Sequence, residues 1–233
     1  MPDDNELFHV GHRERLRQKF LDGQLADYEK LELLLTYSIP RRDVRPLARA
    51  LAKHFGGVYY VFTAPIQELM KFKGLGRSSA ILIKLNQELM SLSYRKSLEN
   101  KNIFCNDQDL IAFLRLEMSG LDHEELRVYY MNNGFSIIDW EIHSKGTIDE
   151  APMYPSEIIK HALMANSRNL ILVHNHPMSD NTFSTADIIN TEQLIRAAAT
   201  HGINLYDHYV VASGIVHSMR GECLLNQSKS LNK

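Results

Sequence analysis

The residues best suited to chemistry lie in one short stretch, HNHPMSDNTFSTAD, which runs from His174 to Asp187. His174 and His176 are two residues apart, so on a β-strand their side chains would point to the same face, with Cα atoms roughly 6–7 Å apart. Two imidazoles on one face can bind a single metal ion. Pro177 has no N–H group and cannot continue a central strand. The chain should therefore leave the sheet at Pro177, where ligands can meet solvent.

A third ligand can come from the helix that follows the loop. Ser184 is expected to cap this helix, which places Asp187 in its first turn. With His174 and His176, Asp187 would complete a site with three protein ligands and an open fourth position, as catalytic zinc sites have. The same Ser-x-x-Asp spacing is also typical of a helix-capping arrangement, which needs no metal. The spacing alone leaves both alternatives open.

The elements around this stretch predict a mixed α/β domain. The apolar run before His174 is short and continuous, which indicates a buried strand. Asn132-Asn133-Gly134 joins two β-rich runs and is a strong hairpin signal. Strands that alternate with helices favour an α/β or α+β fold. We expect these elements at residues 108–118 (helix), 125–147 (hairpin), 154–167 (helix), 169–175 (strand), 184–202 (helix) and 207–219 (two strands).

The first part of the chain differs, because its apolar residues recur at helical spacing from His12 to about Arg95. The last of its helices is expected to end near Ser93, because Ser93–Asn102 is polar and charged and so indicates a linker. The sequence therefore predicts a helical module at 1–96, a linker at 97–104, an α/β domain at 105–225 and a polar tail at 226–233.

Composition and charge limit the functional classes. The chain of 233 residues is 44% apolar, and its two cysteines, Cys105 and Cys223, are far apart and imply no disulfide framework. The acidic start lacks the apolar core of a signal peptide, and no apolar run reaches the roughly 18–20 residues that span a bilayer. A cytoplasmic protein without a membrane partner is therefore expected. Residues 1–100 carry a net charge of +4 and the remainder −6, which is a weak indication that the first part meets nucleic acid.

The helical module contains one further motif, FKGLGRSSAILIKL, which starts at Phe72. Its two glycines, Gly74 and Gly76, lie between predicted helices, permit a tight turn and resemble a helix-hairpin-helix. Backbone N–H groups at the start of the next helix can then hold a phosphate, with Lys73 and Arg77 beside it. Such binding to DNA would not depend on base sequence. The alternative is a purely structural module or a surface that docks protein.

The pattern His-x-His, seven residues, Ser, two residues, Asp resembles the JAMM signature of the MPN metalloprotease superfamily. His174, His176, Ser184 and Asp187 match that signature without a gap. The resemblance implies an MPN/JAB fold, and it implies one Zn²⁺ per chain with His174, His176 and Asp187 as ligands.

The wider context resembles the RadC family over nearly the whole chain. That resemblance also implies that the α/β domain is preceded by a small all-α module of the helix-hairpin-helix type. Met178-Ser179 and Phe183 depart from the Ser-Gly and the proline that RadC proteins typically have, and neither departure removes a ligand. The matching segments are HNHP at 174–177, Gly146-Thr147, YPSEI at 154–158 and Asp207-His208.

The resemblance further implies a glutamate base at the opening of the domain's first strand, in a pattern that Glu124-Glu125-Leu126 matches. Glu124 is the first choice and Glu125 the second, because strand registers can differ by one residue. Glu141 and Glu157 are candidates by position only. Asp207-His208 would either support the ligands or bond only to the backbone.

The function implied by the resemblance is metal-assisted hydrolysis, in this superfamily usually of a peptide or isopeptide bond. Glu124 would deprotonate a zinc-activated water, and the Ser184 hydroxyl would help to stabilise the oxyanion. One alternative is a DNA-repair-associated accessory protein that binds DNA and has a non-proteolytic metal domain. Another is a metal-dependent nuclease. The expected partners are DNA, through the helical module, and a protein or peptide substrate.

Overall fold

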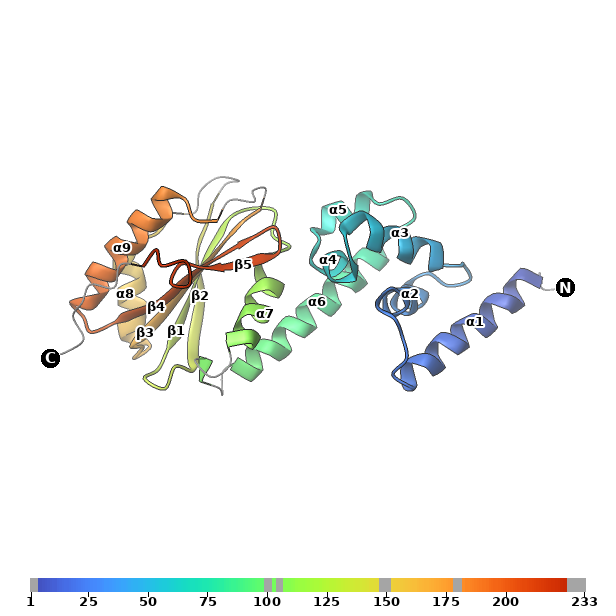
Figure 1. Ribbon diagram of the computed structural model, residues 1–233, viewed down its shortest axis with the longest axis horizontal. Coiled ribbons are helices and arrows are strands. Elements are labelled where there is room, and N and C mark those ends of the chain that lie inside the picture. The colour runs from blue at the N-terminus through green and yellow to red at the C-terminus, as the bar shows by residue number, and fades with distance from the viewer. Residues whose placement is uncertain (1–3, 99–101, 104–106, 147–151, 178–181, 226–233) are drawn as a thin grey trace. The chain divides into compact units, whose positions relative to one another are not determined.

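The computed structural model describes residues 4–98, 102–103, 107–146, 152–177 and 182–225, and it divides into two compact units, Met1–Glu88 and Leu89–Lys233 (Figure 1). None of the helices in these described ranges combines the length and the apolar character that crossing a bilayer requires. Several residues named from the sequence lie outside the described ranges: Cys105, Thr147, Met178, Ser179 and the predicted tail at 226–233.

The first unit is all-helical, as the spacing of its apolar residues predicts. Its core is formed by buried residues that include Leu31, Leu51 and Ile83. Pro46 lies in the first turn of the third helix, and Gly56 ends that helix with a positive φ of 83°, as expected for proline and glycine at these positions. The helices are α1 (Asp4–Leu21), α2 (Asp27–Ser38), α3 (Arg45–Phe55), α4 (Val58–Thr63), α5 (Ile66–Lys71) and α6 (Arg77–Leu98), which continues into the second unit.

The second unit is built on a five-stranded sheet with the order β2-β1-β3-β4-β5. Only β3 and β4 are paired in parallel, and the other neighbouring strands are antiparallel. The mixed α/β class and the hairpin at Asn132-Asn133-Gly134 are confirmed. The elements are α7 (Asp107–Met118), β1 (Glu125–Met131), β2 (Ile137–Lys145), α8 (Pro155–Met164), β3 (Asn169–His176), α9 (Thr185–Ala199), β4 (Asn204–Ala212) and β5 (Ile215–Ser218).

Helices cover both faces of the sheet (Figure 1). Alternate residues of β1 and β3 face opposite sides: Val128 and Leu172 pack in one cluster with residues of α8 and α9. Tyr129 and Val173 pack in the other cluster with Phe113 of α7. Because both faces are covered, all of β1 and nearly all of β3 are buried, which explains the continuous apolar run that the sequence shows before His174.

The predicted end of the last helix in the first part of the chain is wrong. We expected it near Ser93, but α6 continues to Leu98. Leu98 is fully buried and, with Ile103, belongs to the same core cluster as α7 and the sheet. Ser91 and Arg95 of α6 also bond to Glu117 of α7. The polar residues after Ser93 hide this packing, so residues 93–98 are helical and anchored in the second unit.

Leu98→Ala should therefore destabilise the second unit. Large-to-small substitutions at fully buried leucines cost about 2–5 kcal/mol, and Leu98 has no exposed surface. Urea unfolding of the full chain, followed by the fluorescence of the single tryptophan, Trp140 on β2, would measure the loss. Leu92→Ala is the matched control, since Leu92 lies on the same helix and is 54% exposed. Equal effects of the two substitutions would contradict the assignment of Leu98 to the core.

Candidate metal centre

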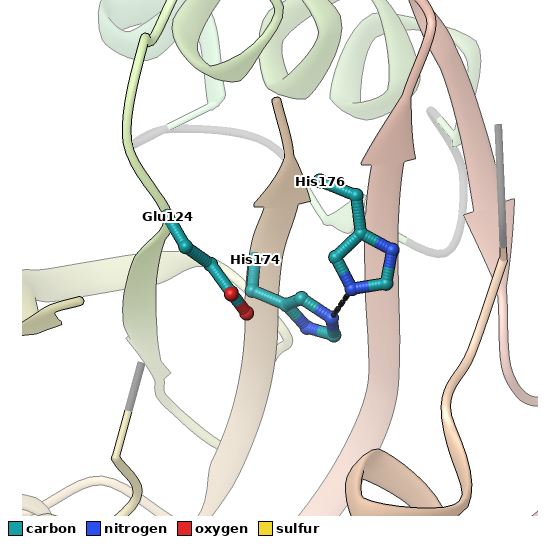
Figure 2. A group of neighbouring side chains, drawn as sticks. All are labelled: Glu124, His174 and His176. Atoms are coloured by element: carbon teal, nitrogen blue, oxygen red, sulfur yellow. Dashed lines mark hydrogen bonds between the residues drawn. The ribbon is translucent and has the colours of Figure 1, made fainter. Parts of the chain in front are cut away.

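Two histidines meet at the carboxyl end of β3. His174 and His176 lie on the sheet face that carries α8 and α9, because they alternate with Val173 and Asn175 along the strand. Their Nε2 atoms are 3.0 Å apart, and a dashed line joins them in Figure 2. His174 is 2% exposed, whereas His176 is only half-buried. The pair is therefore anchored in the core at one residue and open to solvent at the other.

Asp187, in the first turn of α9, faces both imidazoles. Its Oδ1 atom lies 3.4 Å from His174 Nε2, and its Oδ2 atom lies 3.8 Å from His176 Nε2. Ser184 is the N-cap of α9: its Oγ accepts from the backbone N–H of Asp187, and its own N–H and hydroxyl donate to Asp187 Oδ2. The carboxylate of Asp187 therefore takes part in the helix cap and faces the histidines at the same time.

The charge state of Asp187 suits a ligand. Burial raises the pKa of the Asp187 carboxyl, but the hydrogen bond and charge of His174, together with the bonds from Ser184, outweigh it, so the pKa lies below its ordinary value. Asp187 is therefore a carboxylate at neutral pH. One of its oxygens, Oδ2, holds the cap, while Oδ1 is directed at His174.

The spacing of these donors fits a small divalent ion. In a tetrahedral site with Zn–N distances of about 2.0–2.1 Å, two ligand atoms are roughly 3.3 Å apart. His174 Nε2 lies 3.0 Å from His176 Nε2 and 3.4 Å from Asp187 Oδ1, and both distances are close to that value. Two imidazole nitrogens and a carboxylate oxygen are ligands that zinc accepts. The group could hold a metal ion.

Of the candidate glutamates, Glu124 faces the histidines. It immediately precedes β1 and is 7% exposed, and its carboxylate lies within 4.8 Å of donor atoms of His174 and His176 (Figure 2). Glu125 points to the other face of the sheet, where its carboxylate pairs with Arg127 and Lys145. Because side chains alternate along a strand, Glu124 and Glu125 face opposite sides of the sheet. The sequence alone did not show which of the two faces the histidines.

The other two candidates bond elsewhere. Glu141 on β2 accepts a hydrogen bond from Tyr130 and pairs with His161 at 2.8 Å. Glu157 is exposed on α8. Among the described residues, neither joins the group formed by Glu124, His174 and His176.

The comparison with known proteins decides the family. A family model described as a RadC-like JAB domain matches residues 104–224. The chain belongs to the RadC family. A UPF0758 protein of Ruegeria pomeroyi is 37% identical over 214 residues, which cover 91% of this chain and 96% of that protein. A UPF0758 protein of Fusobacterium nucleatum is 35% identical over 231 residues, which cover 95% of this chain and all of that protein. Membership in the RadC family supports a JAMM-type domain in this chain.

A buried histidine from β4 fixes the hydrogen bonding of His174 in this RadC-family chain. Thr191 has one hydroxyl proton, which it donates to the backbone carbonyl of Asp187 at 2.6 Å, so it must accept from His208 Nδ1–H. His208 Nε2 then accepts from His174 Nδ1–H at 2.8 Å. In neutral His174 this leaves the lone pair on Nε2, the atom that faces His176 and Asp187. Metal-bound histidines are typically oriented by such a partner on the other ring nitrogen.

Burial keeps His208 neutral. His208 is fully enclosed, and burial, reinforced by the charge of His174, lowers the pKa of its imidazole well below the ordinary value. The ring of Phe183 packs edge-on against His208 with centroids 5.9 Å apart. Asp207, by contrast, accepts from the backbone N–H groups of His208 and Arg220 and from the hydroxyl of Ser218. His208 therefore supports a candidate ligand, whereas Asp207 bonds to the backbone and to Ser218, and residue spacing carried no signal for the His208 contact.

The glycine motif lies in an exposed turn of the first unit, between α5 and α6. Gly74 has a φ of 95°, a conformation that favours glycine. Leu75 is buried and anchors the turn, whereas Lys73 and Arg77 are exposed on either side of it. The carbonyl of Gly76 accepts from the N–H groups of Ser79 and Ala80 at the start of α6. Within the described residues, neither Lys73 nor Arg77 forms an ion pair.

Removal of both imidazoles should abolish metal binding. We expect His174→Ala with His176→Ala to lose the metal, because two of the three convergent donors disappear. Elemental analysis of protein purified without chelator should give about one metal ion per chain before the change and none after it. His161→Ala with His217→Ala removes two imidazoles outside this group and should retain the ion. Stoichiometric metal in the His174/His176 variant would place the binding site elsewhere in the chain.

Proposed function

We propose that this protein is a zinc-dependent hydrolase of the JAMM type that acts on a peptide or isopeptide bond of a protein substrate. One arrangement carries the proposal: a buried carboxylate, Glu124, lies beside two imidazoles that also face Asp187. Metal-assisted hydrolysis needs ligands for an ion and a separate group that moves a proton. His174, His176 and Asp187 would hold one zinc ion, and Glu124 would be the base.

When bound, zinc would supply an acidic water, with a pKa of about 7, and a positive charge that polarises a carbonyl. Glu124 would accept the proton of the attacking water and pass it to the leaving amine. Its 7% exposure keeps the carboxylate largely away from bulk water, which strengthens its interactions with charged groups. His208 would hold His174 with Nε2 directed at the ion.

Ser184 would have two roles. Its hydroxyl proton is donated to Asp187 Oδ2 at 2.7 Å, so its first role is to orient Asp187. To stabilise an oxyanion, as proposed from the JAMM resemblance, the hydroxyl must turn from Asp187 to the substrate. Ser184 is exposed at the start of α9, where a substrate can reach it. A phosphodiester would meet the same donors, so the nuclease alternative is an outcome of the activity test.

A second activity, DNA binding, is favoured by the glycine turn of the first unit. Gly74 and Gly76 are exposed, and Lys73 and Arg77 flank them without ion pairs among the described residues. We infer that the turn holds a phosphate between backbone N–H groups and these two cations, in a manner independent of base sequence. The helical unit would then deliver the hydrolase domain to DNA.

Glu124→Gln should separate catalysis from metal binding. The amide keeps the shape of the side chain but cannot accept the proton, so hydrolysis should fall by about 10²-fold or more while zinc is retained. A library of internally quenched peptides with α-amide and lysine ε-amide linkages, and a separate plasmid-nicking assay, would measure the loss. Glu157→Gln, on the exposed side of α8, is the control. Full activity in Glu124→Gln would contradict the proposed role of Glu124 as the base.

Lys73→Glu with Arg77→Glu should weaken DNA binding of the full chain. The substitutions replace two phosphate contacts with repulsion, and the remaining affinity should depend less steeply on salt. Fluorescence anisotropy with a labelled random-sequence duplex, from about 50 mM salt upward, would measure both effects. Arg17→Glu with Lys30→Glu makes the same charge change on α1 and α2 and should have a smaller effect. Absence of DNA binding by the unchanged protein at the lowest salt would favour a protein-docking module.

A further inference from the structure

Asn175 lies between the two histidines in sequence but faces the opposite side of the sheet. It is 1% exposed, and its side chain reaches the backbone that opens β1. Its Oδ1 accepts from the N–H of Glu125 at 2.9 Å, and its Nδ2 donates to the carbonyl of His123 at 2.9 Å. These partners fix the orientation of the amide, because an N–H can only donate and a carbonyl can only accept. Asn175 therefore holds the two residues that flank Glu124.

Among the described residues, no regular backbone pairing between β1 and β3 holds the residues that flank Glu124. The backbone pairing of β1 with β3 ends at Leu126 and His174, although β3 continues to His176. Beyond that pair, the Asn175 amide joins the two strands. On the side of β2, the N–H of Gly146 donates to the carbonyl of Glu124 at 2.8 Å. The carbonyl of Glu124 is thus bonded by Gly146, directly after β2, and the backbone groups on either side of Glu124 are bonded by Asn175 of β3.

We propose that Asn175 is a positioning residue that fixes the backbone of Glu124, and hence its carboxylate, beside the histidine pair. The inference rests on the proposed role of Glu124 as base. Only a side-chain amide of this length offers an acceptor and a donor to the two sides of one residue: aspartate lacks the donor, and leucine lacks both. The side chain of Asn175 points away from the site and bonds to the backbone on either side of Glu124, so Glu124 is the group through which its amide acts.

The same strand provides a matched control. Asn169 opens β3 on the same face of the sheet as Asn175, is 6% exposed, and donates from Nδ2 to the backbone carbonyl of Asn132 at 3.1 Å. It too is a buried asparagine that ties β3 to the chain of β1. It lies at the opposite end of the strand from His174 and His176. A general loss of stability should follow from Asn169→Ala as well, whereas an effect on Glu124 should not.

The test compares Asn175→Ala and Asn169→Ala in the full chain, each alone and combined with Glu124→Gln. We expect Asn175→Ala to retain zinc and to lower kcat by about 10- to 100-fold, since a displacement of about 1 Å of a catalytic group can cost 10² in rate. In the Glu124→Gln background it should cause no further loss, because the group that it positions is already inactive. The backbone amide of Glu125 should exchange with solvent at least tenfold faster in Asn175→Ala and at the unchanged rate in Asn169→Ala.

Two results would overturn the proposal. One is an unchanged exchange rate of the Glu125 amide in Asn175→Ala, and the other is an equal loss of kcat in the unchanged and the Glu124→Gln backgrounds. If Asn175→Ala does not fold, Asn175→Asp replaces it: this variant retains the acceptor for Glu125 and loses the donor to His123, so kcat should still fall. If the unchanged protein hydrolyses no probe, the proposed function fails, but the exchange measurement still decides whether Asn175 holds the backbone around Glu124.

Discussion

The position of β3, between an antiparallel and a parallel neighbour, is the constraint on which the candidate centre depends. Its antiparallel pairing with β1 brings Glu124 to the carboxyl end of β3. Its parallel pairing with β4 places Leu172 beside His208, so that the imidazole of His208 reaches His174. The helix that connects β3 to β4 must pack back on one face, and its first turn carries Asp187 to the same strand end. The two strand pairings of β3 and the helix that follows it therefore bring Glu124, His208 and Asp187 to the histidine pair.

Local sequence was enough for part of this arrangement. Alternation predicted that His174 and His176 share a face, proline at 177 predicted where the strand would end, and the Ser-x-x-Asp spacing predicted the cap of α9. These are statements about residues within a few positions of one another, where chain geometry limits the outcome. Local sequence could not decide between Glu124 and Glu125. The choice depends on where β1 begins, and the sequence Glu124-Glu125-Leu126 is compatible with either register.

The remaining features arise from contacts that are distant in the sequence. His208 and Thr191 become relevant only when β4 pairs with β3 and α9 packs over them. The sequence shows Asn175 only as one residue of the HNHP motif. The structure shows that its side-chain amide bonds to the backbone on either side of Glu124. Leu98 lies in a polar segment, and only the core of the second unit explains its burial. In each case a tertiary contact overrides what the neighbouring letters indicate.

Hydrogen bonds within the protein hold two of the three proposed ligands, Asp187 and His174, and the backbone of the proposed base. Ser184 holds Asp187 through the cap, His208 holds His174 through its Nδ1 atom, and Asn175 holds the backbone of Glu124. None of these bonds uses the atoms proposed to face an ion: Asp187 Oδ1, His174 Nε2 and the carboxylate of Glu124. Because the orientation is set by other atoms, little conformational entropy is left to lose when an ion or a substrate binds. The carboxylate of Glu124 lies within 4.8 Å of donor atoms of both histidines, which is close enough for the proton transfer that we propose for it.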